Sequence, residues 1–381
     1  MQQANKQLGV GMVGYSFMGR AHSNAYRQVG RFFEVDPEPR MAAVCGRDAA
    51  ATARAADALG WESHETDYRR LVEREDVDLV DVVTPGYTHR EIVLAALAAG
   101  KHVLCEKPLA NTLEEAREMV AAAREAGTVN MVCFNYRRAP AVQLAKRLVE
   151  SGRLGEIRHW RAKYLQDFIM DPAFPLIWRL QKDKAGSGAL GDIGAHIVDL
   201  AHFLVGPIAE VSGMTETFVK ERPLEAGTGT GEVTVDDAAA FLARFENGAI
   251  GTFEASRFAA GRRNQNSFEI NGSKGSVAFD LERMNELQVY LEDDSDVPGF
   301  RTVNVTEAEH PYAAAWWPAG HILGYEHTFV HTVKDLLDGV GAGKSPAPTF
   351  EDGYRCQAVL DAVERSAASR EWTEPEKEAL R

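Results

Sequence analysis

The sequence is poor in cysteine, in basic residues and in long apolar runs. Its four cysteines, Cys45, Cys105, Cys133 and Cys356, are scattered without a C-x-x-C pair, which argues against a zinc ribbon and a thioredoxin-like centre. Reduced thiols of a cytosolic protein are the simplest account of them. The segment Met1–Gln7 contains no long apolar run. We therefore expect no signal peptide, no membrane span and a cytoplasmic protein.

Positive charge is also scarce. Against 56 Asp and Glu there are 42 Lys and Arg, so the formal charge is 42 − 56 = −14. Nucleic acids and anionic membranes are themselves negative, which makes both unfavourable as main partners. At 381 residues the chain is long enough for two domains. Its 45% hydrophobic content is ordinary for a globular protein.

Residues 8–135 alternate between short apolar runs and amphipathic stretches. Continuous apolar strands that alternate with helices are typical of a doubly wound parallel sheet covered on both faces. The expected strands are Leu8–Val13, Met41–Cys45, Leu79–Thr84, Val103–Cys105 and Val129–Phe134. The expected helices are Gly19–Val29, Ala49–Leu59, Glu91–Ala99 and Leu113–Ala126. We place this first domain at residues 1–138.

The pattern changes near residue 140, where Pro140–Ser151 is expected to form a connecting helix. Runs rich in β-branched and aromatic residues follow, separated by hairpin turns such as Glu246–Gly248. Residues 139–381 are therefore predicted to form an α+β domain with an open, mostly antiparallel sheet. The expected strands are Ile157–Leu165, Ile208–Val219, Phe241–Phe245, Ala249–Phe258, Ser267–Ile270, Ser276–Phe279 and Leu287–Leu291. The helices expected to cover one face are Ile193–Leu204, Glu326–Leu337 and Tyr354–Ser369.

A glycine-rich turn follows the first expected strand. The frame G-x-G-x-x-G falls on Gly14, Ser16 and Gly19. Gly14 permits the tight turn and Gly19 a close helix–strand contact, whereas the position that approaches a pyrophosphate is serine. Its small hydroxyl group could itself meet a phosphate. The turn predicts dinucleotide binding, and the alternative is a strand–helix turn that merely requires small residues.

The end of the second strand bears on the choice of cofactor. NAD enzymes often carry a carboxylate here for the ribose hydroxyls, whereas this chain has Gly46 and Arg47. An arginine can pair with the 2′-phosphate of NADP. The nearby carboxylate of Asp48 keeps NAD possible as the cofactor. The sequence thus predicts NAD or NADP, with Arg47 favouring acceptance of NADP. The alternative for Arg47 is a solvated surface charge.

Lys107 lies in the tight turn Glu106-Lys107-Pro108 after an apolar strand. An ammonium held there could hydrogen-bond a substrate hydroxyl and stabilise alkoxide charge as the carbon is oxidised. Pro108 fixes the turn and allows a cis Lys107–Pro108 bond. The alternative is a surface lysine paired with Glu106.

A second group of polar residues lies on an apolar helix. The spacing of Asp192, His196 and Asp199 places them on one stripe of a regular α-helix. His196 could act as a general base held by a carboxylate. The three residues could instead share a metal ion, or form a buried network or helix cap. The spacing by itself leaves these interpretations open.

With these motifs together, the chain resembles the Gfo/Idh/MocA family of NAD(P)-dependent sugar and polyol oxidoreductases. The resemblance covers nearly the whole chain and rests on motifs in the family's order. They are the Gly14 turn, Thr84-Pro85-x-x-x-His89, Ala99–Val103, Glu106–Pro108, Asn135–Arg138 and Gly188-Ala-Leu-x-Asp192-x-Gly-x-His196. The resemblance implies a Rossmann domain, a C-terminal sheet used as an oligomer interface, and no metal. It also implies that Lys107, Asp192 and His196 are the catalytic set.

Several stretches look closest to the levoglucosan dehydrogenase-like members of the family. They are Phe17–Ser23, Phe134–Val142, Tyr164–Asp167 and Trp178-Arg179. Aromatic faces pack on the C–H groups of a polyol, while amide and guanidinium groups bind its hydroxyls. The substrate residues implied are Tyr136, Gln166, Trp178, Arg179, Asp192 and His196, with His327 as a further candidate. The cofactor-binding residues implied are Gly14, Ser16, Phe17, Met18, Gly46, Arg47, Thr84, Pro85, His89, Glu106 and Lys107. Core packing is the alternative for Trp178, and an interface ion pair for Arg179.

The reaction expected is the reversible oxidation of a secondary hydroxyl, at C3, of a sugar or an anhydrosugar such as levoglucosan. His196 would take the hydroxyl proton, Lys107 would polarise the oxygen, and Asp192 would orient His196. Alternatives are an inositol dehydrogenase, a non-catalytic sugar or cofactor sensor with the same fold, and glycosidic cleavage through transient oxidation. The apolar positions of the C-terminal sheet predict a homodimer or homotetramer formed through it.

Overall fold

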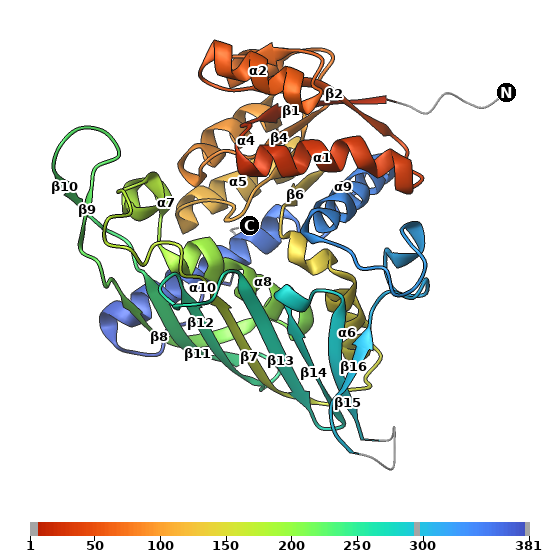
Figure 1. The fold of residues 1–381 in the computed structure, drawn as a ribbon, viewed down its shortest axis with the longest axis vertical. Coiled ribbons are helices and arrows are strands. Elements are labelled where there is room, and N and C mark those ends of the chain that lie inside the picture. The colour runs from red at the N-terminus through yellow and green to blue at the C-terminus, as the bar shows by residue number, and fades with distance from the viewer. Residues whose placement is uncertain (1–6, 293–297, 378–381) are drawn as a thin grey trace.

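The computed structural model describes residues 7–292 and 298–377. Two sheets dominate it, one built from the N-terminal half of the chain and a wider one from the C-terminal half (Figure 1). The first sheet has six strands in the order β3-β2-β1-β4-β5-β6, and neighbouring strands are parallel. These strands are β1 Gln7–Val13, β2 Glu38–Cys45, β3 His64–Glu65, β4 Leu79–Val82, β5 His102–Cys105 and β6 Asn130–Val132.

Helices cover this sheet on both faces, which confirms the predicted doubly wound arrangement. Strand β4 is buried along its whole length, as a strand covered on both faces must be. Even Asp81 at its centre is buried, and its charge faces a histidine instead of water. The helices are α1 Phe17–Phe32, α2 Ala49–Leu59, α3 Tyr68–Glu73, α4 His89–Ala98 and α5 Leu113–Ala126. Strand β3 and helix α3 were not predicted, because both are short and carry little periodic signal.

The second sheet has eight strands in the order β16-β15-β14-β13-β7-β12-β11-β8. It is mostly antiparallel, as predicted, but β7 and β12 run parallel. A parallel pair needs a long connection, and the chain between these two strands includes helices and β8. The strands are β7 Ile157–Leu165, β8 Ile208–Glu216, β11 Ala238–Phe245, β12 Ile250–Ser256, β13 Gln265–Gly272, β14 Gly275–Asp280, β15 Glu286–Leu291 and β16 Arg301–Asn304. A separate ribbon is formed by β9 Glu221–Pro223 and β10 Thr230–Glu232.

Helices lie between the two sheets and join them (Figure 1). Helix α10 contacts both α5 of the first layer and β8 of the second, and α9 packs along α1. The last helices therefore pack back on the Rossmann half. These helices are α6 Pro140–Glu150, α8 Ala195–Leu204, α9 Tyr325–Ala342 and α10 Phe350–Ser369, while the short α7 Lys182–Ala185 lies in a loop region.

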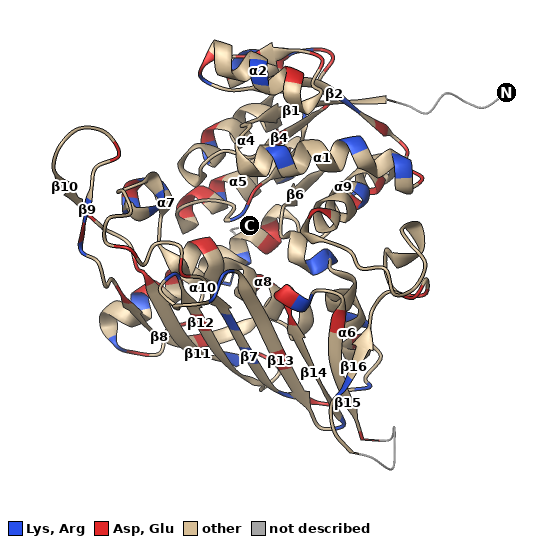
Figure 2. Cartoon of the chain, in the orientation of Figure 1, with Lys and Arg blue, Asp and Glu red and all other residues tan. Residues whose placement is uncertain are grey.

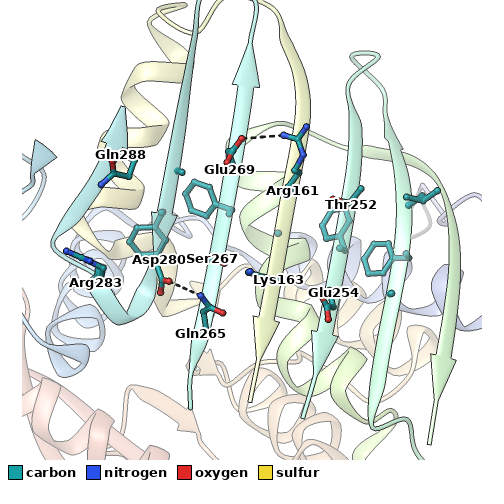
Figure 3. A pocket seen from close by; sticks show the side chains of 18 of the residues that line it. Arg161, Lys163, Thr252, Glu254, Gln265, Ser267, Glu269, Asp280, Arg283 and Gln288 are labelled. Atoms are coloured by element: carbon teal, nitrogen blue, oxygen red, sulfur yellow. Dashed lines mark hydrogen bonds and ion pairs between the residues drawn. The ribbon is translucent and has the colours of Figure 1, made fainter. Parts of the chain in front are cut away.

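The other face of the second sheet is open over the described residues. Along β7 the side chains alternate, so that Tyr164 is buried toward α8 while Arg161 and Lys163 point away from it. Figure 3 shows the hollow on this open face, where Arg161 is paired with Glu269 at 3.4 Å. Large apolar side chains exposed on this face are Met214, Leu242 and Ile250. The hollow is thus separated by the sheet itself from the residues predicted to be catalytic.

All four cysteines are free and buried. Among the helices of the described residues, none combines the length and apolarity needed to cross a bilayer. In the view of Figure 2, acidic and basic residues are interspersed over both halves of the molecule.

Candidate active site

The turn after β1 is shaped to hold an anion. Gly14 has a φ of 108°, and a Cβ there would lie 2.9 Å from the carbonyl oxygen of Val83. A Cβ on Gly19 would lie 2.7 Å from the carbonyl oxygen of Gly14. The exposed Ser16 is the N-cap of α1, makes no side-chain cap hydrogen bond, and precedes a first turn without acidic residues. The first N–H groups of α1 and the Ser16 hydroxyl therefore suit the pyrophosphate of a dinucleotide.

The residues after β2 form a different part of this cradle. A Cβ on Gly46 would lie 2.1 Å from Cε1 of Tyr15, so the Tyr15 ring packs directly against the glycine. Arg47 is exposed. Asp48 caps α2, because its Oδ1 accepts a hydrogen bond from the backbone N–H of Ala51 at 2.7 Å. Asp48 is the carboxylate that could favour NAD as the cofactor. One of its two oxygens is therefore already engaged in a hydrogen bond within the protein.

His89 connects two turns at the edge of the cradle. It is buried, with Nε2 2.9 Å from the carbonyl oxygen of Thr84 and Nδ1 3.0 Å from that of Pro108. Both ring nitrogens face the chain itself. The structure therefore places His89 behind Thr84 and Pro85, as a brace between the turn after β4 and the turn after β5.

Lys107 points into the space between the two halves of the chain. Its Nζ donates to the backbone carbonyl oxygen of Asp192 at 2.6 Å and lies 3.4 Å from Oδ1 of the same residue. The Lys107–Pro108 bond is cis, as the sequence allowed. Glu106 is buried and its Oε1 faces Nε2 of His22 at 3.0 Å, while the ion pair of the ammonium is with Asp192. The alternative of a surface lysine paired with Glu106 is therefore wrong.

Three cationic side chains surround the Asp192 carboxylate. Besides Lys107, Nη1 of Arg257 lies 3.6 Å and Nε of Arg179 lies 3.9 Å from its Oδ2. Burial raises the pKa of Asp192, but these cations outweigh it and bring the pKa to about 2. Asp192 is therefore an anion throughout the neutral range and cannot exchange a proton there.

His196 is buried among aromatic rings at the start of α8. Its ring centroid lies 4.5 Å from that of Tyr136 and 5.7 Å from that of Tyr164. Burial, and after it the charge of Lys107, lowers the pKa of His196 well below its usual value, while Asp192 opposes this. The imidazole is neutral at pH 7 and can accept a proton. The Asp192 carboxylate accepts a hydrogen bond from Lys107 and not from the His196 imidazole. Asp192 therefore acts on the pKa of His196 through its charge alone.

Asp199 does not join the other two residues of the predicted stripe. It is buried and accepts two hydrogen bonds from Arg137, from Nη2 at 2.7 Å and from Nε at 2.9 Å. A π-helical turn at Leu190–Gly194 precedes α8 and interrupts the regular spacing. The carboxylates of Asp192 and Asp199 thus point to different partners, and the interpretation of a shared metal ion loses one of its ligands.

Replacing Asp199 tests this structural role. We expect Asp199→Asn to lower the free energy of unfolding by about 1.5–3 kcal/mol, because Arg137 loses a bidentate carboxylate partner and, among the described residues, keeps only Asp352, at 3.6 Å, as a charged one. Urea unfolding would measure the change. The turnover of the folded variant should stay close to that of the wild type, and a loss of turnover without a loss of stability would return Asp199 to the catalytic set.

The predicted sugar residues Tyr136 and Gln166 are connected through two residues that the sequence analysis did not assign. The hydroxyl groups of Tyr136 and Tyr164 lie 2.9 Å apart. Oδ1 of Asn264 accepts from the Tyr164 hydroxyl at 2.7 Å and from Nε2 of Gln166 at 2.8 Å. Asn264 lies in a polar turn before β13, and only the pairing of β13 with β7 brings it here. No local signal marks it.

Trp178 and Arg179 lie at another edge of the cluster. The Arg179 guanidinium lies over the Trp178 ring at 4.4 Å, and Trp178 is only partly buried. The fully buried Arg257, which directly follows β12, was not predicted as a site residue. His327 caps α9 by accepting from the N–H of Gly324 at 3.0 Å. Tyr325, close by in sequence, contacts the cluster instead, with its ring 6.3 Å from that of Tyr136.

The fold and this site define an NAD-dependent oxidoreductase of the sugar dehydrogenase type. Residues 8–134 match the oxidoreductase family with an NAD-binding Rossmann fold, and residues 142–278 match the GFO/IDH/MocA C-terminal domain. The chain belongs to the Gfo/Idh/MocA oxidoreductase family.

Individual relatives are similar over almost the full length. Levoglucosan dehydrogenase of Pseudarthrobacter phenanthrenivorans is 43% identical over 384 residues, covering 97% of this chain and 98% of the relative. The crystal structure of an oxidoreductase domain protein from Kribbella flavida is 58% identical with a TM-score of 0.95, covering 98% of this chain and 100% of that one. A levoglucosan dehydrogenase in complex with NADH and levoglucosan is 43% identical with a TM-score of 0.95, covering 97% and 100%.

Proposed function

We propose that this protein reversibly oxidises a secondary hydroxyl, at C3, of levoglucosan or a closely related anhydrosugar, with NAD⁺ as the preferred acceptor. The observation that carries the proposal is the meeting of Lys107 with Asp192 beside a neutral His196. The similarity to levoglucosan dehydrogenase, which is solved with NADH and levoglucosan, supports the substrate and the cofactor.

The chain's own residues would divide the work as follows. His196 removes the proton of the reacting hydroxyl, because its imidazole is neutral and buried next to Lys107. Lys107 donates a hydrogen bond to the same oxygen and stabilises the negative charge that develops on it. The Asp192 anion holds the ammonium in place. The bound nicotinamide supplies the acceptor for the hydride.

Further attributes belong to the same proposal. We place the domain boundary between residues 138 and 139, and we propose a cytoplasmic homodimer or homotetramer formed through the open face of the second sheet. Exposed Met214, Leu242 and Ile250 on that face support burial against a second copy. Light scattering would give the number of subunits. A monomer at micromolar concentration would contradict this part.

The first experiment is an absorbance assay at 340 nm with NAD⁺ or NADP⁺ and a panel of levoglucosan, glucose, other hexosides and myo-inositol. We expect the largest rate with levoglucosan and NAD⁺. A rate with myo-inositol alone would favour an inositol dehydrogenase. Release of an aglycone without net NADH formation would favour glycosidic cleavage. NADH binding without turnover of any substrate would favour a sensor, although a pure binder has no need of Lys107 and His196.

Arg47 decides how well NADP⁺ is used. We expect Arg47→Ala to raise the KM for NADP⁺ about tenfold through loss of one charge-assisted hydrogen bond to the 2′-phosphate. The KM for NAD⁺, which lacks that phosphate, should not change. Equal effects on both cofactors would show that Arg47 does not discriminate between them.

A further inference from the structure

A buried imidazole lies directly behind the turn that carries Lys107. His22 belongs to α1, is 1% exposed and has its Nδ1 2.8 Å from Oδ2 of Asp81 on β4. Its Nε2 lies 3.0 Å from Oε1 of Glu106 and 3.5 Å from Sγ of Cys133. The ring of Phe329 covers it at 5.3 Å between centroids. The family resemblance gave Glu106 a role in cofactor binding but assigned none to His22, Asp81 or Cys133.

The two carboxylates decide the charge of this imidazole. Asp81 and Glu106 are 0% and 5% exposed, and each faces a different ring nitrogen. A neutral ring donates from only one nitrogen, so it would leave one buried carboxylate facing a lone pair. The imidazolium donates from both. Burial lowers the pKa of His22, but Asp81 and Cys133 together raise it well above its usual value.

Glu106 connects His22 to the backbone of Lys107 through its two carboxylate oxygens. While Oε1 faces His22, Oε2 accepts a hydrogen bond from the Lys107 N–H at 3.1 Å. From the same turn, the side chain of Lys107 reaches the carbonyl oxygen of Asp192 at 2.6 Å. The N-terminus of α1, with Ser16 as its N-cap, forms the anion cradle. His22 therefore links the helix of the cofactor cradle to the turn of the predicted catalytic lysine.

We propose that His22 is a positioning residue, which as an imidazolium anchored on Asp81 fixes Glu106 and thereby sets the place of Lys107 for proton and hydride transfer. The inference rests on the proposed function for its kinetic consequence only. Displacing a reacting group by about 1 Å costs on the order of a hundredfold in rate, and that is the size of effect expected from loss of this anchor.

A matched pair of variants separates the two hydrogen bonds. His22→Asn places an amide near the position of Nδ1, where it can donate to Asp81 but does not reach Glu106. His22→Gln places an amide near Nε2 and can donate to Glu106. We expect His22→Asn to lower kcat on the order of a hundredfold, with a raised primary deuterium isotope effect. The KM for the sugar and the Kd for NADH should change little, and His22→Gln should recover most of kcat.

A control variant distinguishes positioning from mere loss of stability. Val29→Ala opens a cavity at a fully buried position of the same helix without touching the Glu106 contact. It should lower Tm and leave kcat unchanged in assays run well below Tm. Equal kcat losses in Val29→Ala and His22→Asn, or a His22→Asn enzyme with kcat within threefold of the wild type, would overturn the proposal.

Two measurements test the anchor without any substrate, so that failure of the proposed function stays distinguishable. In ¹⁵N-histidine-labelled protein at pH 8 we expect one ring with both nitrogens protonated, absent in His22→Gln. A crystal structure of His22→Asn should show Nζ of Lys107 displaced from the Asp192 carbonyl. A singly protonated His22, or an unmoved Lys107 in that crystal, would overturn the proposal even if no sugar of the panel were oxidised.

Discussion

Lys107→Met is expected to lower kcat about 10²–10⁴-fold while NADH binding is retained. Methionine keeps an unbranched, mostly buried stem, so packing around the 16% exposed side chain should survive. What is lost is the ammonium that donates to the Asp192 carbonyl oxygen and acts by its charge on His196. Initial rates at 340 nm and fluorescence titration with NADH would measure the two properties.

Two further variants test whether the effect depends on the shape of the cationic group and on its position. Lys107→Arg keeps the positive charge but replaces a compact ammonium by a planar fork, so it should recover little activity. Lys220→Met removes an ammonium that is 67% exposed and paired with Glu216 at 3.1 Å. It should leave kcat unchanged. A Lys107→Met enzyme that turns over within threefold of the wild type would remove Lys107 from the mechanism.

His196→Asn should reduce kcat/KM by a similar factor, about 10²–10⁴-fold, because it removes the proton acceptor from the site. Asparagine retains a polar side chain of similar reach at the base of the ring, which limits the loss of packing. The Kd for NADH should stay within a few-fold of the wild-type value. His64→Asn, at an exposed position of β3, is the matched control and should have no effect.

The pH profile of the wild-type enzyme gives a second test of His196. The base must be deprotonated to act, and burial together with Lys107 lowers the pKa of His196 well below 6.5. A lowered pKa shifts the acidic limb of kcat/KM for oxidation to lower pH, so this group should produce no limb between pH 6.5 and 7.5. A limb with its midpoint above pH 6.5 that disappears in His196→Asn would show that the imidazole is not held neutral.

Local sequence was sufficient for most of the regular structure. Leu113–Ala126 and Ile157–Leu165 coincide with α5 and β7, because an apolar stripe at helical spacing and a β-branched, aromatic run each admit one favourable backbone. Short elements such as β3 were not predicted, because two residues cannot show a hydrophobic periodicity. The parallel pairing of β7 with β12 also escaped, because register depends on where a long connection returns.

The residues of the candidate site also fall into two groups, those that local sequence motifs predict and those that only the tertiary structure brings together. Lys107, Asp192 and His196 could be found because their motifs are local and chemically unusual on apolar elements. Spacing alone placed Asp199 on the same stripe, and the structure corrects this, because Asp199 pairs with Arg137 and a π-helical turn at Leu190–Gly194 interrupts the regular spacing. Asn264 and Arg257 carry no motif and enter the cluster only through strand pairing.

By itself the sequence determined the two-part α/β architecture and predicted the anion-binding glycine turn and the separate motifs that carry Lys107, Asp192 and His196, because each of these motifs depends on residues close together in the chain. The tertiary structure decided which charges face one another. It placed Asp192 among three cations, kept His196 neutral by burial, and set His22 between two buried carboxylates. The physical reason is that charge states follow from burial and from partners separated by tens of residues, and local sequence specifies neither.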